Sequence, residues 1–309
     1  TGSWRLRQLD PDLFDWSQFI SETREEGPTR YLRAVYRCLR DDCRTLESLN
    51  HGVKMKLRDW DYVDSIDDDG AAEAVEYVRR TDFGSEEFLY VNLMEAHTPY
   101  DPPEAYKTVD VTHGRGLEAT IAKGDHTSID AEAVRQAYDD CVRYLSDVYE
   151  ELFGLLVDEF DYVITLSDHG ELLGEHGGWM HGYGLYRELT NVPLSIYGPE
   201  MDDRRTDDLV SLLDIHATVL DIATGESSPR GHSILDDDRR ENCLMEYHGF
   251  TAQKLEKLRS AGISEERVTQ YDQTLRGLAR SNYYGFETPN GFVETGEHET
   301  DGQEALQEF

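Results

Sequence analysis

Two side chains with metal-binding chemistry, Asp168 and His169, stand next to each other where an apolar run ends. The run Tyr162–Leu166 is short and rich in β-forming residues, which is typical of a strand buried on both faces. In open α/β sheets, ligands bind just beyond the carboxyl ends of the strands. A carboxylate followed by an imidazole at that point offers two ligands to a cation. The same pair is also typical of a turn with a hydrogen-bonded histidine, so the surrounding residues must decide between the two interpretations.

A glycine-rich loop follows this pair and contains two more histidines, His176 and His181. Glycines permit backbone angles that a regular helix does not use, so the segment is predicted to be a loop. They stand at Gly170, Gly174, Gly177, Gly178, Gly182 and Gly184.

A second strand-like run, Phe88–Met94, also leads to an imidazole, that of His97. Between the two runs lies a long stretch with an apolar stripe at helical spacing, from Val134 to Leu156. The order strand, helix, strand predicts a βαβ crossover with parallel strands, whose carboxyl ends meet at one edge of the sheet. We therefore expect His97 to lie close to Asp168.

The chain as a whole predicts an α/β fold with a mostly parallel central sheet flanked by helices, followed by a small C-terminal α+β antiparallel part. Three regions are expected: a poorly defined helical segment at 1–70, an α/β catalytic portion at 71–235 and a C-terminal subdomain at 236–309. The later predicted elements are a strand at Val192–Tyr197, a helix at Leu209–Ile222 ended by Gly225, a helix at Ala252–Ala261, and strands at Asn282–Glu287 and Gly291–Glu294.

The charge is strongly acidic, with 64 acidic and 30 basic residues and a formal net charge of −34. This balance argues against binding to nucleic acid or to an anionic membrane surface. An anionic substrate would need local positive charge from a metal ion and histidines. The acidic residues are spread along the chain and lysine occurs at only six positions, so we expect a halophilic protein whose self-repulsion is screened by salt.

The four cysteines, Cys38, Cys43, Cys141 and Cys243, form no CxxC pair. Cys38 and Cys141 fall on apolar helical faces and are predicted to be buried thiols, neither disulfides nor zinc ligands. The sequence contains neither an apolar run of about 18 residues nor a charged leader, which predicts a soluble, cytoplasmic protein. Because the chain begins with Thr1 and not with Met, a leader or a longer segment could precede it.

Several motifs together resemble the sulfatase family of the alkaline-phosphatase superfamily. They are HTPYDPP at 97–103, SDHGELLGEHG at 167–177, LYRELTNVPLSIYGP at 185–199, LVSLLDIHATVLDIATG at 209–225 and RGHSIL at 230–235. Their order and strand context make the resemblance specific, and it extends from about residue 71 to the C-terminus. The family's fold is an α/β sheet of the kind predicted above, here incomplete at the N-terminus.

The resemblance implies a metal-dependent hydrolase of sulfate esters, either small-molecule or saccharide esters. Asp168 and His169 match two of the family's metal ligands, and the metal in sulfatases is usually Ca²⁺. Many sulfatases carry Asn where His169 stands, whereas His is typical of relatives that act on phosphonates or phosphates, so Mn²⁺ or Zn²⁺ is also possible. His97 and His181 match positions that contact the anion or protonate the leaving group. His176 is expected to be structural.

The family's nucleophile motif, Cys or Ser followed by x-Pro-x-Arg, does not occur in this chain, and neither does the strand that ends in paired aspartates. Three hypotheses follow. The chain is the C-terminal two-thirds of a sulfatase, or a non-catalytic pseudo-sulfatase that binds anions or a partner. Alternatively, it belongs to a phosphonate or phosphodiester hydrolase or a phosphoryl transferase of the same superfamily. The sequence does not indicate an oligomeric state.

Overall fold

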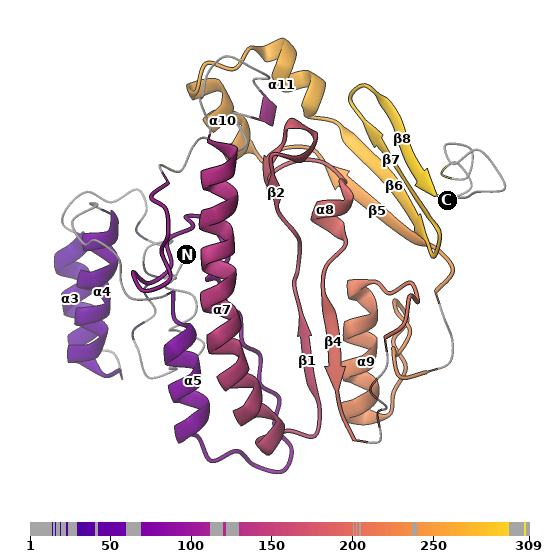
Figure 1. Ribbon diagram of the computed structural model, residues 1–309. Coiled ribbons are helices and arrows are strands. Elements are labelled where there is room, and N and C mark those ends of the chain that lie inside the picture. Colours follow the sequence, from indigo (N-terminus) through magenta and orange to yellow (C-terminus); the bar gives the residue numbers. More distant parts are fainter. Residues whose placement is uncertain are drawn as a thin grey trace. The chain divides into compact units, whose positions relative to one another are not determined.

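The computed structural model describes residues 14, 16, 19, 23, 30–40, 43–59, 69–111, 120–121, 130–199, 201, 203, 205–236, 240–296 and 306, without the side chains of 51 and 54–59 (Figure 1). The chain divides into two compact units. One comprises Thr1–His113 and Glu132–Val163, and the other comprises Gly114–Ala131 and Ile164–Phe309. Each unit is described by itself below. The predicted boundaries at 70 and 235 stay predictions.

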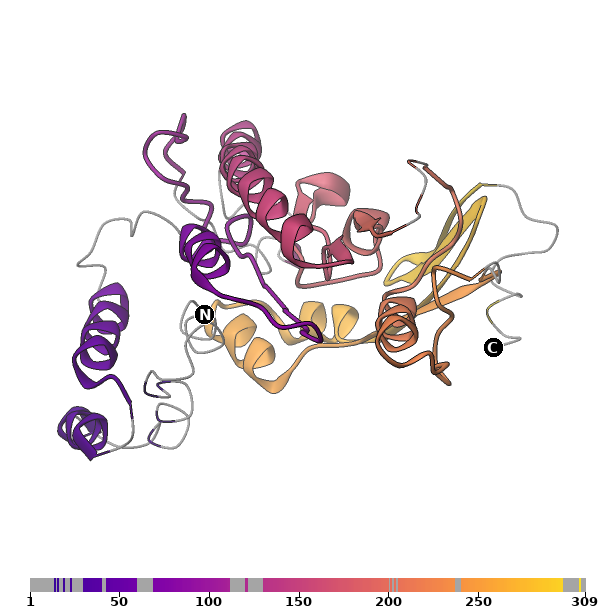
Figure 2. The same ribbon diagram turned by 90° about the horizontal axis from the view of Figure 1, so that it is seen from below.

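Within the described ranges, the helices before residue 160 whose bounds are defined number four. They are α3 (Arg30–Arg40), α4 (Thr45–Asp59), α5 (Ala71–Arg80) and α7 (Ala131–Glu159). The helix predicted before the second strand is α7, which runs without a break for 29 residues (Figures 1 and 2). Cys38 of α3 and Cys141 of α7 are buried free thiols, as predicted.

The first unit has its main core between α5, α7 and the segment that follows α5. Val75, Val78, Leu152, Leu156 and Val163 are the buried members of this cluster. Leu89, Val91 and Leu93 pack against it, whereas Phe88 and Tyr90 are exposed. The predicted strand Phe88–Met94 therefore alternates between partly buried and exposed side chains. The prediction expected this segment to pair with another strand. Within the described residues it forms no ladder of hydrogen bonds with a neighbouring strand.

A buried carboxylate, that of Asp140, fastens the loop after His97 to α7. Its oxygens accept hydrogen bonds from Thr108 N (2.6 Å), Thr108 Oγ1 (2.8 Å) and Gln136 Nε2 (3.0 Å), and Arg143 forms an ion pair with it. Burial alone would raise the pKa of Asp140, but these hydrogen bonds outweigh it and lower the pKa to about 2. Asp140 therefore stays ionised inside the protein and fixes the course of the loop.

In the second unit, β1 (Val163–Leu166) pairs with β4 (Leu194–Tyr197), and both match predicted strands. Ser167 N donates to Pro193 O (3.4 Å), so the end of β1 lies beside the start of β4 and the two strands run antiparallel (Figure 1). The sequence predicted a parallel pair for Phe88–Met94 and Tyr162–Leu166 and gave no direction for Val192–Tyr197. The loop between β1 and β4 returns the chain to the end of β1 at which it left, so these two strands run in opposite directions.

The loop between β1 and β4 contains short elements that organise it. They are β2 (Leu172–Leu173), the 3₁₀ turn η1 (Glu175–Gly177), β3 (Trp179–Met180) and α8 (Arg187–Thr190). β2 and β3 form an antiparallel hairpin in which Leu172 lies opposite Met180.

After β4, α9 (Leu212–Thr224) is capped by Ser211 and ends at Gly225, which has φ of 70°. The helix starts later than predicted because Ser211 and Asp214 form a capping box there. The buried carboxylate of Asp214 also accepts hydrogen bonds from His232 N (3.0 Å) and from Arg240. Burial by itself would raise the pKa of Asp214, yet the bonds from Arg240, His232 and Ser211 lower it. Asp214 thus ties the segment after α9 back onto the helix.

The C-terminal part is an antiparallel sheet in the order β5-β6-β7-β8, with two helices between β5 and β6 (Figures 1 and 2). The elements are β5 (Cys243–His248), α10 (Ala252–Ser260), α11 (Glu265–Tyr271), β6 (Thr274–Arg280), β7 (Tyr283–Thr288) and β8 (Gly291–Gly296). The predicted hairpin is β7 and β8, so the expected antiparallel part is present. β5 and β6 were not predicted.

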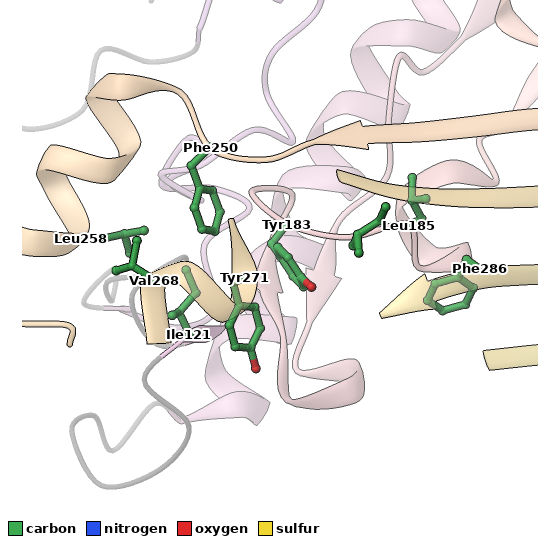
Figure 3. Packing of buried hydrophobic residues seen from close by; sticks show 9 residues of the cluster. Ile121, Tyr183, Leu185, Phe250, Leu258, Val268, Tyr271 and Phe286 are labelled. Atoms are coloured by element: carbon green, nitrogen blue, oxygen red, sulfur yellow. The ribbon is translucent and has the colours of Figure 1, made fainter. Parts of the chain in front are cut away.

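The core beneath this sheet also holds the loop that follows His181 (Figure 3). Tyr183 and Leu185 of that loop are buried in it, and Tyr183 meets Tyr271 edge to face at 4.8 Å between ring centroids. The full set of buried members is Ile121, Tyr183, Leu185, Phe250, Leu258, Val268, Tyr271, Leu275 and Phe286. The C-terminal sheet therefore supports the loop that carries the predicted site.

The substitution Asp140→Asn should lower the free energy of unfolding at neutral pH by about 2 kcal/mol, because it removes a buried charge that accepts hydrogen bonds from Thr108 and Gln136. The neighbouring exposed Asp139→Asn is the matched control and should change stability little. Denaturant unfolding in concentrated KCl measures both. The loss should shrink as the pH falls from about 4 towards 2, because the folded carboxyl has a pKa of about 2 against an ordinary 3.8 and is protonated there. Equal losses for both variants would contradict the role of Asp140.

Candidate active site

The residues after β1 form a tight turn that presents Asp168 and His169. Ser167 Oγ donates to His169 O (2.6 Å), and His169 N donates to the Asp168 carboxylate (3.0 Å). The Asp168 side chain is 86% exposed and that of His169 is 41% exposed. Both predicted metal ligands therefore lie at the surface of the second unit and are not packed in its core.

The hydrogen bond made by His169 decides which of its nitrogens can bind a cation. Nδ1 lies 2.9 Å from Gly170 O, and because a carbonyl only accepts, Nδ1 carries the proton. In the neutral ring, Nε2 then holds the lone pair that a metal requires. This Nε2 lies 3.7 Å from Asp168 Oδ1, a separation that two ligands of one cation can have.

His181 lies against His169, so the structure brings these two predicted site residues together. Their rings stack with centroids 4.2 Å apart and planes 30° apart. The Nδ1 atom of His181 lies 3.2 and 3.3 Å from the two carboxylate oxygens of Glu171. Because a carboxylate accepts, Nδ1 of His181 also carries a proton.

The β2–β3 hairpin and its neighbours hold His181 in place. Met180, directly before it, has φ of 64°, a conformation in which non-glycine residues are uncommon. Trp179 N donates to Thr120 Oγ1 (2.8 Å), and Tyr183 anchors the following residues in the core. The position of His181 is thus fixed from both sides along the chain.

Position 170 requires a glycine because a side chain would not fit there, and not because of its backbone angles. Gly170 N donates to Leu189 O (2.8 Å), and a Cβ at this position would lie 1.9 Å from Glu188 O. Only glycine allows the backbone beside His169 to approach α8 this closely.

Two further histidines of the second unit, His176 and His216, lie apart from this cluster in their contacts. His176, with φ of 55°, uses Nε2 to contact both oxygens of Glu188 at 3.1 Å and stacks on Tyr186 with centroids 4.5 Å apart. This environment is consistent with the structural role expected for it. His216 is exposed on α9, 3.5 Å from Ser228 Oγ.

His97 belongs to the first unit, where it is half-buried. Its Nδ1 lies 2.7 Å from Thr98 O and therefore donates to this carbonyl. Glu95, two residues earlier, is buried and accepts a hydrogen bond from Ala71 N at the start of α5 (2.9 Å). The grouping of His97 with Asp168 stays a prediction.

The donor set of the second unit fits part of a metal site. Asp168 and His169 supply one oxygen and one nitrogen, but no group of three or more His, Cys, Asp or Glu suited to a metal occurs among the described residues. A divalent cation held by protein normally has more ligands than two, so this pair would need further ones.

Glu171 is a site residue that the sequence reasoning did not single out. It lies two residues after His169 but ten before its partner His181. Only the β2–β3 hairpin brings the two side chains together, and strands of two residues leave no periodicity to recognise.

The chain is similar to known proteins of one family. A family model described as Sulfatase matches residues 37–225. The uncharacterized sulfatase YidJ of Escherichia coli (strain K12) is 27% identical over 200 residues, which cover 57% of this chain and 40% of the relative. The arylsulfatase of Clostridium perfringens (strain 13 / Type A) is 24% identical over 211 residues, 59% of this chain and 42% of that protein. The chain thus spans less than half the length of these two relatives.

Among solved structures, the phosphonate monoester hydrolase of Agrobacterium radiobacter is similar with a TM-score of 0.52 and 20% identity. The similarity covers 72% of this chain and 52% of that one, and it confirms the predicted fold class. No helix within the described ranges is both long and apolar enough to cross a membrane. Since the family model covers more than half of the sequence, the chain belongs to the sulfatase family of the alkaline-phosphatase superfamily.

Proposed function

We propose that this chain carries part of the active site of a metal-dependent hydrolase that cleaves sulfate esters. The observation that carries the proposal is the arrangement of Asp168, His169 and His181. A carboxylate oxygen and an imidazole nitrogen lie 3.7 Å apart, and a second imidazole stacks on the first at 4.2 Å. Membership of the sulfatase family and a relative named as an arylsulfatase support sulfate esters, small or saccharide, as the substrate class.

Asp168 Oδ1 and His169 Nε2 would hold the cation, together with ligands from elsewhere in the protein. A divalent cation, when bound, neutralises the charge of the ester and polarises it. By family resemblance the cation is Ca²⁺, while the imidazole of His169 makes Mn²⁺ or Zn²⁺ suitable as well. The hydrogen bond from Nδ1 to Gly170 O keeps the His169 ring in the tautomer that a metal requires.

His181 and His97 would bind the non-bridging oxygens of the ester or protonate its leaving group. In both residues Nδ1 is already engaged, by Glu171 in one case and by Thr98 O in the other. Nε2 is therefore the atom through which each ring would act on a substrate. Such direct donors are needed, because a chain with a formal charge of −34 repels an anion at long range.

Hydrolysis of a phosphonate or phosphodiester is the second candidate, with phosphoryl transfer as a related reaction. It is favoured by the imidazole at position 169, where many sulfatases carry an amide. The fold of a phosphonate monoester hydrolase is similar to that of this chain, although at 20% identity this likeness concerns the fold alone. A non-catalytic, anion-binding role is the third candidate, because Cys or Ser followed by x-Pro-x-Arg does not occur in the 309 residues.

Asp168→Ala and His169→Ala should each weaken the binding of Ca²⁺ or Mn²⁺ by about tenfold or more, because each removes a ligand or forces its replacement by water. Isothermal titration calorimetry of the chain in concentrated KCl measures this. His216→Ala removes an exposed histidine of α9 and serves as the control. Wild-type affinity in both site variants would refute the metal assignment.

His181→Ala should weaken the binding of 4-nitrophenyl sulfate to the metal-loaded chain by about tenfold, because a hydrogen bond to a charged group is lost. His176→Ala is the matched control from the same loop. Comparison with a 4-nitrophenyl phosphonate monoester at the same pH separates the first two candidate functions. Tighter binding of the sulfate supports the sulfatase, and tighter binding of the phosphonate supports the alternative. Binding of neither ester would contradict an anion site in this chain.

A further inference from the structure

The side chain of Glu171 is shielded from water in a different way from the three carboxylates that are buried among the described residues. Its side chain is only 7% exposed. Asp140, Asp214 and Glu95 each accept at least one hydrogen bond from a backbone N–H group. The carboxylate of Glu171, within the described residues, contacts the Nδ1 atom of His181 with both of its oxygens. A carboxylate excluded from water is costly unless it is paired, so the imidazole is the partner that makes its burial tolerable.

We propose that Glu171 is a positioning residue that sets the tautomer and the ring orientation of His181. This inference rests on the proposed function, in which His181 acts on the ester through Nε2. With Nδ1–H donated to Glu171, a neutral ring carries its lone pair on Nε2, and a protonated ring carries a second N–H there. When Nε2 gives its proton to the leaving-group oxygen, the ring becomes neutral and keeps the proton on Nδ1. Glu171 itself neither gains nor loses a proton.

Because the rings of His181 and His169 stack, the contact between Glu171 and His181 also affects His169. His181 lies on His169 with ring planes 30° apart, so the carboxylate that orients one ring also sets the face presented to the other. The Nδ1 atom of His169 donates to Gly170 O, and the Nδ1 atom of His181 donates to Glu171. Both rings are therefore fixed through their Nδ1 atoms. Glu171 thus links the anion-binding histidine to the proposed metal ligand.

The same loop contains a matched pair that lacks these features. His176 contacts Glu188 through Nε2, and its side chain and that of Glu188 are 47% and 38% exposed. His176 stacks on Tyr186 and not on another histidine. The loop thus contains two pairs of a histidine and a glutamate. In the exposed pair the glutamate contacts Nε2 of the histidine, and in the shielded pair it contacts Nδ1.

The test compares Glu171→Leu, which removes the acceptor, with Glu171→Gln, whose amide oxygen can still accept from Nδ1. The chain is labelled with ¹⁵N-histidine, and ring-nitrogen shifts are recorded in concentrated KCl at pH about 8.5, where an ordinary imidazole is neutral. The signals that disappear in His181→Ala identify His181. Wild type and Glu171→Gln should show the Nδ1–H tautomer, and Glu171→Leu should show a mixture with the Nε2–H form. The control Glu188→Leu should leave the His181 signals unchanged.

A second readout is the affinity of the metal-loaded chain for 4-nitrophenyl sulfate. It should fall about tenfold in Glu171→Leu, because the hydrogen bond to the anion is misdirected, and recover in Glu171→Gln. Unchanged His176 signals show that the leucine variant is folded. If it is not, Glu171→Ala takes its place. A wild-type His181 tautomer in the variant without an acceptor would overturn the inference. If that variant shifts the tautomer while His181→Ala binds the ester normally, then the proposed function of His181 fails and the positioning by Glu171 stands.

Discussion

The burial of a few carboxylates is the constraint on which this structure depends. Most acidic residues of so acidic a chain can stay in water, but Asp140, Asp214 and Glu171 are excluded from it. Each must collect donors to offset the cost of desolvation, and at least one donor of each lies ten or more residues away in the sequence. Asp140 thereby fixes the loop after His97 and Asp214 fixes the segment after α9, whereas Glu171 fixes a single imidazole.

A common hydrogen-bond pattern separates His97, His169 and His181 from His176. In His97, His169 and His181 the Nδ1 atom donates to an acceptor, which is a carbonyl in the first two and a carboxylate in the third. In His176 the engaged atom is Nε2, the outer nitrogen of the ring. A neutral imidazole whose Nδ1 donates a hydrogen bond carries its lone pair on Nε2. The roles expected for these four histidines stay predictions.

Much of the fold, but less of the site, could be predicted from the sequence. The strands at β1 and β4, the helices α7 and α9 and the β7–β8 hairpin have strong periodicity or clear end signals such as Gly225. Whether Phe88–Met94 joins a strand ladder depends on neighbouring strands, and the direction of β4 depends on how the loop before it closes. No local sequence pattern contains this information. Glu171 could not be identified from the sequence for a similar reason. Its role depends on a partner ten residues later, which a hairpin of two-residue strands brings close to it.

The acidity of the chain limits the distance over which groups of the proposed site can attract an anion. The expected adaptation to salt remains a prediction, but its consequence for an anionic ester can be derived. At about 1 M salt the Debye length is about 3 Å, so the repulsion from distant carboxylates is screened. Hydrogen bonds and metal contacts act within that distance and in a partly shielded loop, and they persist. A protein of formal charge −34 can therefore bind an anion only through a few directly contacting groups. Such groups must be held rigidly, because the net negative charge of the chain does not compensate for a misplaced ring.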